Sequence, residues 1–390
     1  MAQTRCYVDY NATTPLRQEV RQGLIDDLGL FGNASSMHES GRIAHNRIES
    51  ARSMVADLIG ADHESIIFTS GGSESNNTVF QTMLWQALDG RDKGGRDEII
   101  ISAIEHPCVL NAADFLVSRG LTLRVLPVDG NGKIHLDELR AYVNERTLLV
   151  SVMLANNEIG TIQDIPAIAR IAKEAGAWVH TDAVQGAGKI SVDVDRLGVD
   201  YASLSAHKIY GPKGVGALYV RKGAPLSPLI RGGHQEHGLR AGTYNNAGIL
   251  GFGKAAELAK EEVQSYGKTM SAFRIQLRDG LLERVPSIRI NGHPRDVLPN
   301  TLNVSFPGAE GEAILLSLDI MGIEASTGSA CASGSLDPSH VLMAIGVGPE
   351  LAHGSIRFSL GLGTTEADIR YILETVPPII ARLRSMSTIQ

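Results

Sequence analysis

Residues 199–214 have the sequence VDYASLSAHKIYGPKG, and this stretch indicates the fold. An apolar run predicts a strand, which delivers Lys208 directly to a glycine-rich turn. Similar runs of strand length alternate with helix-like segments at residues 65–70, 98–103, 122–128, 148–155, 177–181 and 216–220. This alternation predicts an α/β fold whose large domain holds a mainly parallel, seven-stranded sheet with helices on both faces.

After this alternating region, the sequence predicts fewer strands. A helix-like stretch over 247–266 leads into a segment with few strands, which are predicted at 302–306 and 355–360. These elements predict a smaller α+β domain that the extreme N-terminus completes. The expected bounds are 16–263 for the large domain, and 1–15 with 264–390 for the small one.

A last helix is predicted from Thr365 onward. Asp368 stands three residues after Thr365, which is a typical arrangement at a helix start. Because proline lacks a backbone N–H group and crowds the preceding turn, we expect Pro377-Pro378 to break or restart this helix.

The composition favours small-molecule chemistry. The 390 residues carry 36 Lys+Arg against 43 Asp+Glu, and no basic stripe indicates a nucleic-acid partner. No apolar run of about 18 residues predicts a membrane span. The sequence contains three cysteines and begins without a secretory pattern, so we expect a cytoplasmic protein.

Polar residues follow several predicted strands, where ligands of such sheets bind. The turn Gly71-Gly72-Ser73 precedes a helix start and offers backbone N–H groups to an anion, although a plain helix cap explains it nearly as well. His106 follows the second strand and can stack on a planar ring or move protons, or it can be a structural histidine. Asn157 lies in the polar turn after the fourth strand.

Lys208 and Asp182 together indicate a cofactor. A lysine that attacks an aldehyde needs a desolvated place that lowers its pKa, whereas an isolated lysine is more often at the surface. Asp182 can cap a helix, or it can keep a pyridine nitrogen protonated, as pyridoxal phosphate requires. Because both residues end apolar strands, pyridoxal phosphate is favoured. Gln185 can then donate to the ring phenolate oxygen, and Ser205 and His207 to the phosphate.

Two further residues suggest what happens at the cofactor. Cys331 stands among glycine and serine, so its thiol is expected to be accessible and reactive. Cys6 and Cys108 lie in apolar segments and are predicted to be packed core thiols. Arg357 lies within a predicted strand and suits bidentate binding of a substrate α-carboxylate; a structural ion pair is the alternative.

With these residues assembled, the chain resembles the cysteine desulfurases, which are pyridoxal-phosphate enzymes of the class V aminotransferase fold, fold type I. The matching motifs span nearly the whole chain, at residues 10–15, 32–38, 69–77, 105–106, 156–160, 182–185, 205–216 and around Cys331. The segment that follows Cys331 resembles the long-loop group, which serves nitrogenase and general iron–sulfur cluster assembly.

The resemblance implies a role for each matching residue. Lys208 would bond to the cofactor, Cys331 would accept sulfur, and His106 would stack on the ring and act in catalysis. The other cofactor contacts would be Gly72, Ser73, Asn157, Asp182, Gln185, Ser205, His207 and, from the neighbouring subunit of a homodimer, Thr243. The substrate contacts would be Asn11, His38, Asn157 and Arg357. No metal is implied in the resting enzyme, although Cys331 could transiently ligate an iron–sulfur cluster.

The implied reaction converts L-cysteine to L-alanine and leaves the sulfur on Cys331 as a persulfide. A mobile loop of about 325–340 would then deliver it to acceptors such as iron–sulfur scaffolds. A selenocysteine lyase or another class V enzyme with the same cofactor is an alternative. A non-catalytic sulfur carrier on the same fold is another, but the presence of both Lys208 and Asp182 argues against it.

Overall fold

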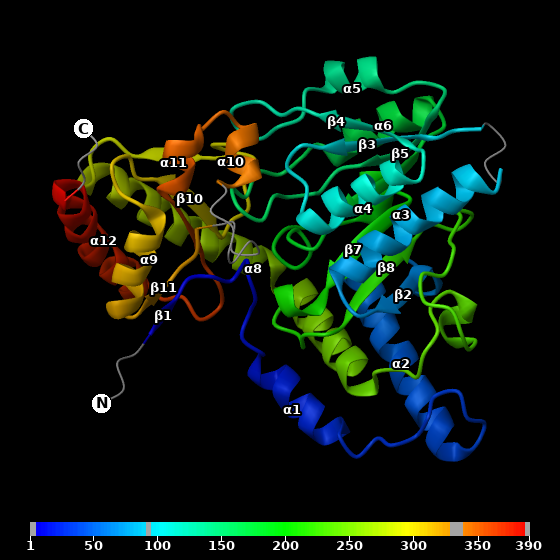
Figure 1. Cartoon of the computed structure of the whole chain (residues 1–390). Helices are drawn as coiled ribbons and strands as arrows, with labels where there is room; N and C mark the ends of the chain where they lie inside the picture. Colours follow the sequence, from blue (N-terminus) through cyan, green and yellow to red (C-terminus); the bar gives the residue numbers. More distant parts are fainter. Residues whose placement is uncertain (1–4, 91–94, 328–337, 387–390) are drawn as a thin grey trace.

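Figure 1 shows two lobes joined by a long helix, α8 (Asn246–Arg284). The structure is a computed structural model that describes residues 5–90, 95–327 and 338–386. Cys331, the predicted sulfur acceptor, therefore lies outside the described residues. Within those ranges, every helix is too short or too polar to span a membrane.

The larger lobe is built on a seven-stranded sheet with the order β2-β8-β7-β6-β5-β3-β4. Its strands are β2 (Ile66–Thr69), β3 (Glu98–Ser102), β4 (Thr122–Leu126), β5 (Thr147–Ser151), β6 (Trp178–Asp182), β7 (Tyr201–Ser205) and β8 (Gly216–Val220). Neighbouring strands are parallel, except that β8 runs antiparallel to β2 and β7. The predicted seven-stranded, mainly parallel sheet is confirmed.

Helices cover both faces of this sheet because both faces are apolar. On β3, Ile99 and Ile101 pack into one core while Ile100 packs into the other. Helices α3 and α4 contribute to the first core, and α2, α6 and α8 to the second. The helices of this lobe are α1 (Gln18–Asp27), α2 (Glu39–Leu58), α3 (Gly72–Leu88), α4 (Pro107–Ser118), α5 (Leu136–Tyr142), α6 (Ile165–Glu174) and α7 (Val194–Leu197), with 3₁₀ turns η1 (His63–Ser65), η2 (Ala206–Lys208) and η3 (Gln235–Gly238).

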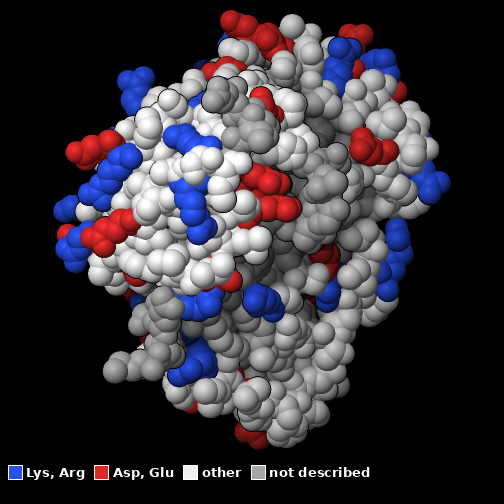
Figure 2. Space-filling model, turned by 60° about the vertical axis from the view of Figure 1, so that its left-hand side comes forward, with Lys and Arg blue, Asp and Glu red and all other residues white. Residues whose placement is uncertain are grey.

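The smaller lobe has its own apolar core beside a three-stranded antiparallel sheet of order β12-β10-β9. The sheet strands are β9 (Arg289–Asn291), β10 (Thr301–Ser305) and β12 (Ser355–Ser359). A parallel pair joins β1 (Cys6–Tyr7) to β11 (Ile323–Glu324), so the N-terminus does add to this lobe. Its helices are α9 (Gly311–Ile320), α10 (His340–Ala344), α11 (Pro349–His353) and α12 (Glu366–Met386). Figure 2 shows acidic and basic side chains interspersed over this lobe.

Helix α8 belongs to both lobes. Ile249, near its start, packs in the core of the larger lobe, whereas Leu277 packs in the core of the smaller one. The helix is 39 residues long, so it continues well beyond the predicted stretch 247–266. The predicted domain boundary after residue 263 falls inside it, and the two-domain division at that point stays a prediction.

The expectation that Pro377-Pro378 would break or restart the last helix is wrong, because α12 continues through both residues. Val376 on one side and Ile379 and Ile380 on the other are buried in the core of the smaller lobe. Burial of an apolar side chain is worth about 1.5–3 kcal/mol, which offsets the roughly 3 kcal/mol that an interior proline costs a helix.

Candidate active site

The carboxyl edge of the seven-stranded sheet gathers most of the predicted site residues. Asp182 and Ser205 are the last residues of β6 and β7, and Lys208 ends the short turn that follows β7. His106 stands between β3 and α4. Parallel strands bring these carboxyl ends together, which is why residues distant in the sequence share one edge.

An anion cradle lies at the start of α3. The helix begins at Gly72, and Gly71 before it provides no side-chain cap, so the first N–H groups have no acceptor within the helix. A Cβ atom on Gly216 would lie 2.6 Å from the Cα atom of Gly71, which shows how tightly β8 packs against this turn. Ser205 Oγ lies 4.0 Å from where a Gly71 Cβ atom would be. Free N–H groups beside a hydroxyl suit a phosphate.

Asp182 is buried and held in place by two donors. Its Oδ2 atom accepts a hydrogen bond from Asn76 Nδ2 at 2.7 Å, and its Oδ1 atom accepts one from the backbone N–H of Val184 at 3.0 Å. Asn76 Nδ2 also lies 3.2 Å from Cys108 Sγ, while Asn76 Oδ1 is buried and has no hydrogen-bond partner among the described residues. Asn76 thus links the carboxylate to the residues around His106, a link that the sequence did not suggest.

His106 caps helix α4 and contacts the thiol of Cys108. Its Nδ1 atom accepts from the backbone N–H of Cys108 at 3.2 Å and lies 3.0 Å from Cys108 Sγ. Burial lowers the pKa of His106, although the charge of Asp182 opposes this, and burial raises the pKa of Cys108 to about 12. The neutral ring therefore carries its proton on Nε2. Cys108 is only half-buried at the edge of a core, whereas Cys6 is the packed core thiol that was predicted.

Lys208 lies against the N-terminal segment of the chain. Its Nζ atom donates to the backbone oxygens of Asn11 and Ala12, at 2.6 and 2.7 Å. His207 Nδ1 lies 3.1 Å from Thr13 Oγ1, and burial lowers the pKa of His207 to about 4. The predicted phosphate contact at His207 would thus come from a neutral imidazole.

Asn11 is a buried hub that joins the two lobes. Its Nδ2 atom donates to Asn157 O at 3.1 Å and to Thr301 Oγ1 at 2.8 Å. Its backbone oxygen accepts from Gln185 Nε2 at 2.9 Å. Lys189, which the sequence analysis missed, donates from Nζ to Asn11 Oδ1 at 2.9 Å and to Gln185 Oε1 at 2.5 Å. In the sequence, its position four residues after Gln185 was the one indication that these two side chains could meet.

Arg357 lies on β12 with its side chain only 3% exposed. Its Nη2 atom is 2.6 Å from Asp9 Oδ1, and its Nη1 atom donates to Asn157 O at 3.1 Å. The structure therefore shows the predicted alternative, an ion pair, at the place where a substrate carboxylate was expected. The backbone of Arg357 also pairs with Ser326, close to the point where the described chain ends before Cys331.

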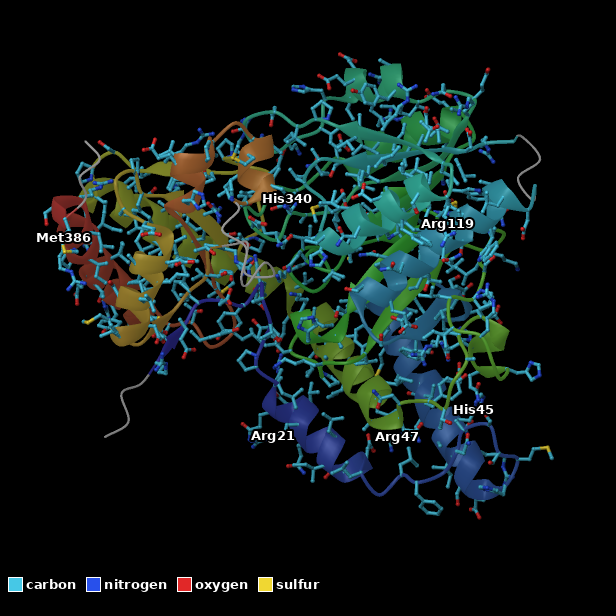
Figure 3. All side chains as sticks on the ribbon, viewed as in Figure 1. Arg21, His45, Arg47, Arg119, His340 and Met386 are labelled. Carbon is cyan, nitrogen blue, oxygen red and sulfur yellow. The ribbon has the colours of Figure 1, made fainter. Side chains whose placement is uncertain are left out.

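The chain resumes at the same edge of the site. Ser339 Oγ donates to Glu158 Oε2 at 2.5 Å, and His340 Nε2 lies 2.9 Å from the backbone oxygen of Glu105. Figure 3 shows His340 on α10, where the smaller lobe faces the larger one. Residues 328–337 are thus flanked on both sides by residues that contact the site.

Two predicted residues are not brought to this edge within one chain. His38 is exposed at the start of α2, where its Nδ1 atom accepts from the backbone N–H of Gly41 at 3.2 Å. Thr243 is exposed on the loop before α8. In the part of the chain that the structure describes, neither has a hydrogen bond to the other predicted site residues, so their roles stay predictions.

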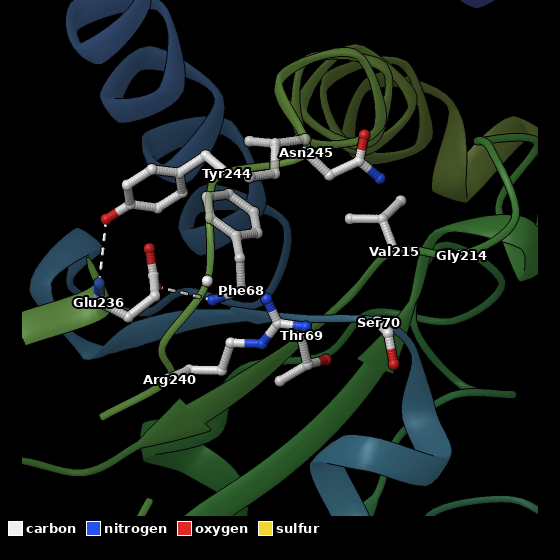
Figure 4. Close-up of a pocket in the computed structure, with 11 residues that line it drawn as sticks. Phe68, Thr69, Ser70, Gly214, Val215, Glu236, Arg240, Tyr244 and Asn245 are labelled. Carbon is white, nitrogen blue, oxygen red and sulfur yellow. Dashed lines mark hydrogen bonds between the residues drawn. The ribbon is translucent and has the colours of Figure 1, made fainter. Parts of the chain in front are cut away.

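The loop that carries Thr243 is nevertheless firmly anchored (Figure 4). Buried Glu236 accepts from Arg52 Nη1 and Nη2 at 2.6 and 2.7 Å, and from the backbone N–H of Phe68 at 2.8 Å. Tyr244 Oη accepts from the backbone N–H of Glu236 at 3.0 Å. Beside these contacts lies a cavity of about 50 Å³, between this loop and the end of β2. This anchoring fixes the position from which Thr243 projects.

Comparisons with known proteins agree with this arrangement. Residues 6–372 match the family described as "Aminotransferase class-V". The cysteine desulfurase IscS of Dictyoglomus turgidum is 50% identical over 382 residues, which cover 98% of this chain and 96% of that protein. IscS of Methanosarcina thermophila is 48% identical, with 98% and 93% covered. A solved structure of a NifS-like protein superposes with a TM-score of 0.90 at 40% identity, covering 97% of this chain and all of that one. The chain belongs to the class-V aminotransferase family and, within it, to the cysteine desulfurases.

Proposed function

We propose that this protein is a pyridoxal-phosphate-dependent cysteine desulfurase that converts L-cysteine to L-alanine and transfers the sulfur to Cys331 as a persulfide. The observation that carries this proposal is the placement of Lys208, Asp182 and Gln185 at one sheet edge, beside the anion cradle of α3. Membership of the desulfurase family supports the same reaction.

The residues of this edge fit the cofactor in their chemistry. The N-terminus of α3, with Ser205 and neutral His207, would hold the phosphate, and Asp182 would face the pyridine nitrogen. Gln185 would donate to the ring oxygen, while His106 would lie on the ring face with Asn157 beside it. When bound, pyridoxal phosphate supplies an electron sink for the α-carbon of the substrate.

The other side chains then have defined tasks. Lys208, held by the backbone oxygens of Asn11 and Ala12, would take the α-proton of the substrate. Arg357 would bind the α-carboxylate in exchange for Asp9. The Cys331 thiolate would attack the substrate sulfur: an S–S bond forms, the C–S bond breaks, and the carbon keeps the electron pair and is protonated to give alanine.

We further propose a cytoplasmic homodimer that delivers sulfur to an acceptor such as an iron–sulfur scaffold. Thr243 is exposed on an anchored loop, and among the described residues it has no hydrogen bond to the residues that its own subunit contributes to the phosphate cradle. Thr243 of the partner subunit would therefore complete the cradle. His38 would join the substrate site in the same assembled dimer.

The test uses Cys331→Ser in the full-length protein. This variant is expected to bind pyridoxal phosphate, and to change its visible spectrum when cysteine is added, yet to form no alanine or sulfide. Desulfuration at the wild-type rate would disprove the role of Cys331. Alanine formed from selenocysteine but not from cysteine would instead identify a selenocysteine lyase. A wild-type protein without visible cofactor absorbance after reconstitution would favour a non-catalytic carrier.

A further inference from the structure

Lys189 is a deeply buried lysine that the proposed reaction does not use. Only 3% of the residue is exposed, although an ammonium group is costly to bury unless it has partners. Burial, together with the charges of Lys208 and Arg357, holds the pKa of Lys189 well below its ordinary value. A lysine kept at such a place needs an explanation that packing alone does not supply.

The two contacts of Lys189 are both amide oxygens that accept from it. They are Asn11 Oδ1 at 2.9 Å and Gln185 Oε1 at 2.5 Å. A charged ammonium has three N–H donors and a neutral amine has two, so either form can donate to both oxygens. Asn300 Nδ2 also donates to Asn11 Oδ1 at 3.0 Å, which independently fixes the orientation of the Asn11 amide.

These contacts determine which way the Gln185 amide faces. Because Oε1 is turned toward Lys189, the Nε2 group must be on the opposite side, where one N–H bonds Asn11 O at 2.9 Å. Within residues 5–90, 95–327 and 338–386 the second N–H has no acceptor, so it can serve a ligand. The same Asn11 carbonyl accepts from Lys208 Nζ at 2.6 Å, so Lys189 supports two residues of the site at once.

The backbone before Lys189 is built to bring it there. Gly188 adopts φ +73°, which side-chain-bearing residues rarely adopt, and a Cβ atom on it would lie 2.7 Å from Ile209 Cγ2. Ile209 directly follows Lys208, so this turn packs against the loop that carries the reactive lysine. The N–H of Lys189 closes the turn on Gly186 O at 3.1 Å.

We propose that Lys189 is a positioning residue that holds the Gln185 amide with its N–H group toward the ring oxygen of the cofactor and steadies the Asn11 peptide against Lys208. This inference rests on the proposed function, because it needs pyridoxal phosphate in the site. Lys189 itself touches no reacting atom in this scheme.

The experiment measures pyridoxal phosphate binding to the apoenzyme of Lys189→Met, which keeps the side-chain length but removes the donors. We expect affinity about tenfold weaker, since one ring hydrogen bond loses its orientation, and an altered visible spectrum of the bound cofactor. Lys189→Gln restores a neutral donor and is expected to recover part of the affinity. Lys254→Met is the matched control, because this lysine of α8 has a half-exposed side chain, and it should stay within about twofold of wild type.

A double-mutant cycle with Gln185→Ala separates this role from general destabilisation. In the Gln185→Ala background, Lys189→Met should weaken cofactor binding much less than in wild type, because only the contact with Asn11 is left to lose. An equal loss in both backgrounds, or unchanged affinity and spectrum in Lys189→Met alone, would overturn the inference. Should Lys189→Met fail to fold by circular dichroism, the cycle is run with Lys189→Gln. A wild-type apoenzyme that binds no pyridoxal phosphate would instead refute the proposed function.

Discussion

The seven-stranded sheet of the larger lobe and the three-stranded sheet of the smaller lobe use their side chains in opposite ways. In β3 of the central sheet, Ile99, Ile100 and Ile101 are all buried, and they pack alternately into cores on both faces. In β12 of the smaller sheet, Ile356 and Phe358 face the apolar core, while Arg357 between them faces the site.

This difference shows where each sheet can contribute chemistry. The central sheet has no free face, so its functional groups stand where strands end, as Asp182 and Ser205 do. The smaller sheet offers a whole polar face: Thr301 accepts from Asn11, and Asn303 donates to Glu158 O at 3.3 Å. The site lies between strand ends of one sheet and the polar face of the other.

Lys208, in the turn that follows β7, gives the strongest test of the functional groups at the strand ends. Lys208→Ala removes the proposed base and the cofactor bond, so alanine formation from cysteine is expected to fall by about 10³-fold or more. Lys213→Ala, an exposed lysine five residues on in the same loop, should change the rate by no more than about twofold. Similar losses in both variants would mean that the rate depends on the structure of the loop and not on the Lys208 amine.

The apolar face of the small sheet is tested by Phe358→Ala. Phe358 is fully buried, so the cavity left behind should lower the free energy of unfolding by about 3–5 kcal/mol. Urea unfolding followed by circular dichroism measures this. The Michaelis constant for cysteine should hardly change. A large change would mean that the apolar face of the small sheet also affects substrate binding at its polar face.

Arg357→Met tests the opposite face of the same strand. The loss of the guanidinium should raise the Michaelis constant for cysteine by about 100-fold, with a smaller effect on turnover. Because Asp9 would be left unpaired, stability should also fall. The double variant Asp9→Asn, Arg357→Met is expected to recover stability but not substrate affinity. Recovery of both would show that Arg357 is only a structural partner of Asp9.

Local patterns were enough to predict the central sheet but not the network that joins the lobes. The runs at 65–70 and 148–155 correspond to β2 and β5 within a few residues, because a strand that is buried on both faces is a short, continuous apolar run. The strand-end residues followed from the same pattern. Lys189 could not be found this way, since its partner Asn11 stands 178 positions away and belongs to the N-terminal segment.

The other features that the sequence did not reveal have the same physical origin. The length of α8 depends on two cores that it joins, and the persistence of α12 through Pro377 depends on packing that a local reading of the sequence cannot weigh. The ion pair of Arg357 likewise needs the fold to bring Asp9 beside it. The role of Cys331 was predicted from the glycine and serine residues around it and from the family resemblance, and it stays a prediction because the residue lies outside the described ranges.

Glu105, at the edge of the central sheet, should make the unfolding free energy depend on pH. Burial raises the pKa of this carboxyl at the central sheet edge from 4.5 to about 8, so the folded protein keeps a proton that the unfolded chain releases. The stabilisation contributed by Glu105 is therefore fully present below about pH 4.5 and is lost as pH rises toward 8, by roughly 1 kcal/mol per pH unit. Glu105→Gln keeps an oxygen for Ser102 Oγ and Met153 N. Its unfolding free energy should lose this slope, and an unchanged slope would exclude Glu105 as the source.

The smallest effect is expected at the start of α12, outside both sheets. The N–H of Thr365 donates to Asp368 Oδ2 at 2.7 Å, and the N–H of Asp368 donates to Thr365 Oγ1 at 3.2 Å, so the predicted helix start is confirmed. Thr365→Ala should lower the unfolding free energy by about 0.5–1 kcal/mol, because the cap is exposed and water can replace it. Asp368→Ala in the same background should add little, since each residue needs the other. A loss as large as that of Phe358→Ala would contradict this prediction, because an exposed cap would then stabilise the fold as much as a buried core residue.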